Sequence, residues 1–334
     1  MDNRIWGGLP DDIIFRVLSW LPVSTIVRSE LVCKSWKSYI NSSQFCSLQS
    51  ETLSEINQPW ICVSFQFLPS PWRPIATGDG VLCMLCKAPI GFRLYVCNPI
   101  SKSFSEISLP SNYFRHFFLV SGLFREKTSG SFMVVLVGSE LVSEELGGFV
   151  LTAKVYNSEM RLWVQSWSFP VNYPLSPWKA ISNGVLYCIL DQLSCSIVAF
   201  NIRSRHWFTL KAQMPEHLTE VRLMDHKNRL VMIGGLGSHG ITKEIGIGKL
   251  NNSLMEWEMI GRLPEDFCNF FLRTPSRRVK CVGHGSLIYF ASKKFPCIAI
   301  YNIAQYCWHW VDSLPFMVDP LYHMFTGFCF EAGL

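Results

Sequence analysis

Two cysteines, Cys83 and Cys86, form a C-x-x-C pair, the spacing found in zinc sites and redox-active dithiols. They lie in the apolar run from 80 to 86, Gly-Val-Leu-Cys-Met-Leu-Cys, which predicts a β-strand. Residues three apart in a strand point to opposite faces of its sheet. A zinc or redox site needs both sulfurs on one side, so the pattern favours buried thiols over a metal site.

The other residues that could do chemistry also lack the spacing of a site. The eight histidines show neither an H-x3-5-H nor an H-E-x-x-H pattern. The 13 cysteines are odd in number and scattered, which favours free thiols in a reducing compartment. We therefore expect no catalytic residue, no metal ligand and no cofactor.

The N-terminal residues and the hydropathy pattern indicate a compartment. Asp2, Asp11 and Asp12 stand where a signal peptide would need a basic and then an uncharged apolar stretch. No run of 18 apolar residues occurs, so we expect no membrane contact. The sequence predicts an intracellular protein, in the nucleus, the cytoplasm or both.

The composition is apolar and weakly basic. Charged residues make up 16% of the 334 residues and aromatic residues 14%, which excludes an intrinsically disordered chain. The formal net charge of +5 is too small to indicate nucleic acid, so we expect no direct nucleic-acid contact. So apolar a chain must bury its surface in a large core or against partners.

Residues 9–41 have a helical pattern that differs from the rest of the chain. Pro10 with Asp11 and Asp12 predicts a helix start, and Pro22 ends that helix or begins the next. On a helical wheel, apolar residues from Ile13 to Leu21 cover an arc about twice the roughly 100° that one core requires. We therefore expect the first helix to contact its own small core and also a partner.

The motifs of this region resemble an F-box. Leu9-Pro10, a following helix, Leu21-Pro22 and then Val32-Cys33-Lys34-Ser35-Trp36 occur at the family's spacing. The resemblance implies a three-helix module over residues 5–48 that docks on the Skp1 adaptor of a cullin-based ubiquitin ligase. It implies that the docking surface and its supporting core comprise Leu9, Pro10, Ile13, Ile14, Val17, Leu18, Leu21, Pro22, Val32, Cys33 and Trp36.

From about residue 60 the chain changes to short apolar runs separated by Gly, Pro, Asn and Ser, which predicts β-strands without further helices. A repeat of about 50 residues runs through it, in which an Asn is followed six positions later by Trp or Phe and then by Pro. Such a period with several strands per unit predicts propeller blades. The five copies are Asn98/Phe104/Pro110, Asn157/Trp163/Pro170, Asn201/Trp207/Pro215, Asn251/Trp257/Pro264 and Asn302/Trp308/Pro315.

This part resembles the divergent kelch repeats of plant F-box/kelch proteins, although only Gly234-Gly235 shows the paired glycine of those repeats. We expect an all-β kelch-type propeller over 60–334, reached by a linker at 49–59, with about six blades. Residues 60–68 and 324–330 would complete the sixth blade by closing the ring. The opening residues 1–6 also resemble those before the F-box in the floral-organ-identity group, the Unusual Floral Organs type.

The combined resemblance implies a non-catalytic substrate-recognition subunit of a Skp1–cullin–F-box ubiquitin ligase. The F-box would bind the adaptor, and through it a cullin, and the propeller would bind an unidentified target protein. One alternative is a non-degradative scaffold or transcriptional cofactor with the same modules. Another is a kelch-type oxidase, which the dispersed histidines disfavour. The longer connections at 139–148 and 235–246 are candidates for the target-binding face.

Overall fold

The computed structural model describes most of the chain. The residues it describes are 8–42, 44–45, 48–49, 52, 59–64, 72–78, 80–89, 91–98, 103–110, 118–125, 131–143, 148–190, 195–239, 241–272, 279–292, 298–311 and 326–331. The resemblance of residues 1–6 to the floral-organ group therefore concerns residues outside this part. None of the described helices is long and apolar enough to cross a membrane.

Three short helices form the N-terminal module, as predicted: α2 (Asp11–Ser19), α3 (Val23–Ser29) and α4 (Lys34–Ile40). Pro10 and Pro22 are the N-caps of α2 and α3, and each carbonyl accepts the first helical hydrogen bonds. Each proline follows a leucine that packs on the module's core, so both Leu-Pro pairs fix the entry of a helix. The core contains Ile14, Leu18, Ile26, Trp36, Ile40 and Phe45.

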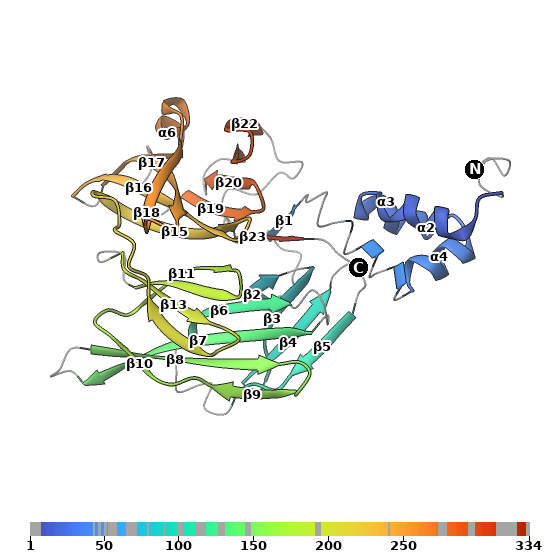
Figure 1. Cartoon of the computed structure of the whole chain (residues 1–334), viewed down its shortest axis with the longest axis horizontal. Helices are drawn as coiled ribbons and strands as arrows, with labels where there is room; N and C mark the ends of the chain where they lie inside the picture. The colour runs from blue at the N-terminus through green and yellow to red at the C-terminus, as the bar shows by residue number, and fades with distance from the viewer. Residues whose placement is uncertain are drawn as a thin grey trace.

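The rest of the described chain folds into antiparallel sheets (Figure 1). Each of the five larger sheets is one propeller blade, which confirms the predicted all-β propeller. Blade 1 contains β2 (Trp72–Gly78), β3 (Val81–Lys87), β4 (Phe92–Asn98) and β5 (Ser103–Ile107). Blade 2 contains β6 (Phe118–Arg125), β7 (Phe132–Ser143), β8 (Gly148–Asn157) and, both paired with β8, β9 (Leu162–Gln165) and β10 (Phe169–Val171).

The remaining three blades are simple four-stranded meanders. Blade 3 contains β11 (Leu175–Ser182), β12 (Val185–Leu190), β13 (Ile197–Asn201) and β14 (His206–Thr209). Blade 4 contains β15 (Leu218–His226), β16 (Arg229–Ser238), β17 (Ile241–Asn251) and β18 (Glu256–Arg262). Blade 5 contains β19 (Val279–His284), β20 (Leu287–Ser292), β21 (Ile298–Asn302) and β22 (Cys307–Val311).

The two ends of the propeller sequence pair with each other and close the ring. β1 (Pro59–Ser64) pairs antiparallel with β23 (Thr326–Glu331). The first strands of the five blades contact one another in order, and β23 contacts both β19 and β2. The predicted pairing of the ends is thus confirmed. A complete sixth blade is not, because the sixth position holds a two-stranded sheet among the described residues.

The repeated asparagine has the same structural role in each blade. It is the last residue of the third strand, and in four blades its Oδ1 accepts hydrogen bonds from the backbone N–H groups two and three residues later. The fourth residue of each of these turns has a positive φ, without being glycine. The aromatic residue of the repeat then stands opposite the residue before the asparagine.

Two expectations about secondary structure are wrong, whereas the target-binding role expected at 139–148 and 235–246 stays a prediction. The described residues within 139–148 and 235–246 are the ends of the long paired strands β7–β8 and β16–β17, with polar and glycine residues where these strands extend beyond the core. A helix also occurs where none was expected, α6 (Glu265–Leu272). Its start, Pro264 followed by Glu265 and Asp266, repeats the Pro-acid-acid signal of α2.

The helical module lies outside the ring and contacts blade 1 (Figure 1). Val23, the first residue of α3, is 4% exposed and packs on Leu82 and Met84 of β3. These residues lie on the face of blade 1 opposite to that of Cys83, which packs toward blade 2. That face points to the sixth position, so α3 covers a surface that a complete sixth blade would cover.

Candidate functional site

The three N-terminal helices expose large apolar side chains away from their own core. On α2, Ile13 is 41% exposed, Val17 39% and Trp20 55%, whereas Ile14 and Leu18 are buried. The wide apolar arc therefore divides into two faces. This was expected for a helix that packs on its own core with one face and leaves the other face exposed for a partner. Val27, Leu31 and Val32 extend the exposed apolar surface over α3 and the turn before α4.

The predicted site residues separate by burial. Ile14, Leu18 and Trp36 belong to the core, and Leu9 and Leu21 are half-buried against it. Their role in the structure is to support the module rather than to form its surface. The residues that the structure leaves exposed are Pro10, Ile13, Val17, Pro22, Val32 and Cys33.

Cys33 is positioned as the N-cap of α4. Its Sγ accepts a hydrogen bond from the backbone N–H of Trp36 at 3.4 Å and lies 3.3 Å from Ser35 Oγ. The Ser35 hydroxyl and the Trp36 amide lower the pKa of this exposed thiol. The Cys-x-x-Trp spacing thus sets the start of α4 and places Trp36 in the core.

Sequence reasoning missed three exposed members of this surface. Trp20, Val27 and Leu31 were not assigned to docking, although Trp20 is 55% exposed, Val27 39% and Leu31 87%. The helical wheel could have assigned Trp20 to this surface, because Trp20 lies on the same side of α2 as Ile13 and Val17.

The centre of the ring contains a lysine that links three blades. Lys179 Nζ, on β11, donates to the Ile75 carbonyl of β2 and to Ser121 Oγ of β6, both at 3.0 Å. Ser121 Oγ also donates to the Ile75 carbonyl at 2.5 Å. Burial lowers the pKa of the Lys179 ammonium to about 8. Its two hydrogen bonds join strands of three blades, which fits a structural role.

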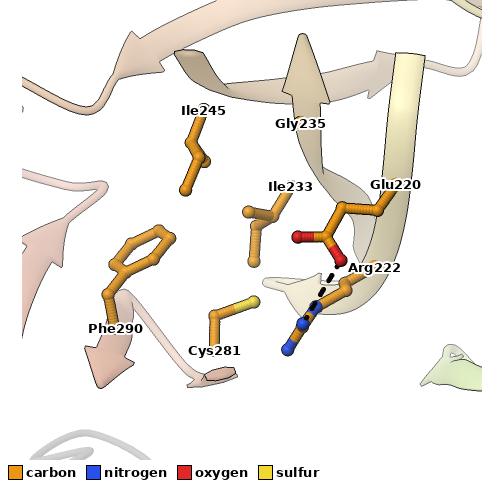
Figure 2. Close-up of a pocket in the computed structure, with 7 residues that line it drawn as sticks. All are labelled: Glu220, Arg222, Ile233, Gly235, Ile245, Cys281 and Phe290. Carbon is orange, nitrogen blue, oxygen red and sulfur yellow. Dashed lines mark ion pairs between the residues drawn. The ribbon is translucent and has the colours of Figure 1, made fainter. Parts of the chain in front are cut away.

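A second charged group lies between blades 3 and 4. The Arg222 guanidinium stacks over the Trp178 ring at 4.1 Å and pairs with Glu220 at 3.6 Å. Figure 2 shows this ion pair at one side of a small cavity that Cys281 and Phe290 of blade 5 also line. The cavity measures about 10 Å³, room for about one water molecule, so no substrate fits in it.

The buried cysteines of the propeller are packing groups, unlike the exposed helix cap Cys33. Cys83 is fully buried and Cys86 half-buried, so the C-x-x-C sulfurs face different surroundings. Burial raises the pKa of the Cys83 and Cys188 thiols to about 12. Within the described ranges, no three His, Cys, Asp or Glu side chains are grouped to hold a metal ion.

A three-helix module with an exposed apolar face, followed by a β-propeller, defines the architecture of an F-box protein with a propeller domain. The F-box domain family matches residues 6–48. An F-box domain implies, in general, binding to a Skp1-type adaptor.

Comparison with curated proteins extends this match to nearly the whole chain. An Arabidopsis thaliana protein named F-box/kelch-repeat protein is 27% identical, covering 98% of this chain and 89% of its own. A second Arabidopsis protein of that name is 24% identical over 100% of this chain and 89% of its own. Arabidopsis UNUSUAL FLORAL ORGANS is 21% identical over 95% of this chain and 80% of its own. The chain is thus an F-box/kelch-type homologue related to that protein.

Proposed function

We propose that this chain is the substrate-recognition subunit of a Skp1–cullin–F-box ubiquitin ligase. The observation that carries the proposal is the exposed apolar face of the helical module, with Ile13 and Val17 beside a separate, complete core. Exposed apolar surface on so small a module marks a partner interface. The adaptor would cover this face and connect the chain to a cullin.

The propeller would bind the target protein. In this role the chain supplies no chemistry: it holds the target's lysines near a ubiquitin-conjugating enzyme and so raises their effective concentration. The contact of Val23 with blade 1 supports this role, because it ties the docking module to the propeller. The proposal places the protein in the nucleus, the cytoplasm or both.

Capture of a Skp1-type adaptor by the full-length chain tests the proposal. Ile13→Asp and Val17→Asp should each weaken capture about tenfold or more, because a charge replaces an exposed apolar contact at the interface centre. Thr25→Asp, at an exposed polar position of α3, is the matched control and should leave capture unchanged. Undiminished capture by both α2 variants would refute the docking face.

Capture with the proteasome blocked tests the second half of the proposal. The target should accumulate with the adaptor and cullin, and its half-life should lengthen when this chain is depleted. A bound protein whose half-life does not change on depletion would instead identify a non-degradative scaffold.

A further inference from the structure

A pocket of about 360 Å³ lies between blades 2 and 3. It opens among the turns that join the third and fourth strands of these blades, on the face opposite to the long β7–β8 and β16–β17 hairpins. Its volume is within the range of roughly 300–1,000 Å³ typical of ligand sites. The pocket therefore has room for a large side chain together with part of its backbone.

Polar and apolar groups both line the pocket, Asn157 among the polar ones, and the apolar part of its wall is adaptable. Blade 2 contributes Val155 and Val164, and blade 3 contributes Ile202. Two methionines, Met133 and Met160, complete this wall, and Met160 is 57% exposed. Methionine side chains adjust to an incoming apolar group because they are unbranched and polarizable.

The rim of the pocket is cationic. Arg203 and Arg205, in the turn of blade 3, both line it. The Arg203 guanidinium lies over the Phe124 ring at 5.7 Å, and Arg205 is held in a left-handed conformation with φ 58°. The facing turn of blade 2 adds Arg161, so in the two turns, 158–161 and 202–205, Glu159 is the single acid against three arginines.

We propose that this pocket receives an apolar side chain of an acidic peptide segment in the target protein, with flanking carboxylates paired to Arg203 and Arg205. Arginine forks bind carboxylates in pairs of hydrogen bonds, and the apolar wall supplies the burial that selects the central side chain. The inference rests on the proposed role in target recognition and assigns that recognition to one face of the propeller.

The probe is the acetylated, amidated peptide Gly-Asp-Asp-Leu-Asp-Asp-Gly, titrated into the full-length protein labelled with carbon-13 at the methionine methyl groups. The Met133 and Met160 signals should shift, while that of Met259 on β18 should not. Peptides with Asn for each Asp, or with Gly for Leu, should bind about tenfold more weakly, because each lacks one half of the recognition.

Charge reversal distinguishes binding at Arg203 and Arg205 from nonspecific attraction between the acidic peptide and a basic protein. Arg203→Glu with Arg205→Glu should weaken peptide binding about tenfold or more. Lys227→Glu with Arg229→Glu, an equal reversal of two charges at exposed residues of blade 4, should leave it unchanged. Three results would each overturn the proposal. The Asn peptide could cause equal shifts, the Met133 and Met160 signals could stay unshifted, or the methyl signals could shift with protein concentration in the absence of peptide.

Adaptor capture by the same variants keeps this test separate from that of the proposed function. The Arg203/Arg205 double variant should still capture the adaptor, since the pocket lies on the propeller. Failure of wild-type adaptor capture would count against the ligase role, whereas loss of the peptide effect with intact capture would count against the pocket.

Discussion

Lys179 shows how one buried charge makes stability depend on pH. Its ammonium has a folded pKa of about 8 because burial disfavours the charged form, whereas its ordinary value is 10.5. The unfolded chain therefore binds more protons between these values, and the contribution of Lys179 to stability rises as pH increases through 8. The charged form at neutral pH is tolerated because Ile75 and Ser121 accept its hydrogen bonds.

Replacement of Lys179 by Met should remove this dependence. The Met side chain keeps most of the aliphatic stem, and Ser121 still donates to the Ile75 carbonyl. The difference in free energy of unfolding between Lys179→Met and wild type should shift by about 1 kcal/mol in favour of wild type from pH 8 to pH 9. Urea unfolding at pH 7, 8 and 9 measures it.

The comparison between the two proteins is essential in that experiment. Cys83 and Cys188, whose thiols have a pKa raised to about 12, stay protonated in both folded proteins up to pH 9. Ionisation of these thiols in the unfolded chain therefore lowers both stabilities equally, and this effect cancels in the difference. A difference that stays constant from pH 7 to pH 9 would show that Lys179 does not titrate in this way.

At the scale of elements, the turn asparagine stabilises the outer hairpin of blades 2 to 5. In blade 3, Asn201 Oδ1 accepts from the amides of Arg203 at 3.1 Å and Ser204 at 2.9 Å. Asn201→Ala should lower the free energy of unfolding by about 1–2 kcal/mol, because both amides lose their acceptor. Asn252→Ala, at an exposed position in the turn of blade 4, is the control. Thermal unfolding that ranks both variants together would contradict this role.

The strand pattern was predictable because each blade repeats the same turn and the same strand register. The Asn-to-aromatic spacing follows from a four-residue turn and a fixed register, and both are local properties of the chain. The hairpin ends at 139–148 and 235–246 were misread because strands beyond the core lose apolar alternation. Gly234-Gly235 lies inside β16, where a Cβ would come within 2.6 Å of Leu218 and Thr219 on β15.

The division of the F-box residues into surface and core needed the tertiary structure. Ile13 and Ile14 are adjacent and equally apolar, yet Ile13 is 41% exposed and Ile14 is 7% exposed. The choice depends on where α3, α4 and Phe45 pack around α2, which the local pattern does not contain. For the same reason, the local pattern does not indicate that Arg203 and Met160, from two blades, share a pocket.

At the scale of the whole molecule, the ring and the helical module depend on each other. The repeat aromatic of blades 2 to 5 packs toward the preceding blade. In blade 1, where the preceding position holds the β1–β23 sheet, the corresponding Phe104 is 75% exposed. On that same face Val23 covers Leu82 and Met84, so α3 protects part of an otherwise open blade.

Val23→Asp and Val27→Asp should therefore affect different properties, stability and adaptor capture respectively, although they lie one turn apart on α3. Val23→Asp places a carboxylate against β3 and should lower the free energy of unfolding by about 2–3 kcal/mol. It should also speed hydrogen exchange in β3 and β4. Val27→Asp, at a 39% exposed position, should leave exchange unchanged and weaken adaptor capture instead. Unaltered exchange of β3 and β4 in Val23→Asp would mean that the module and the ring are independent, and target placement would then depend on the linker rather than on this contact.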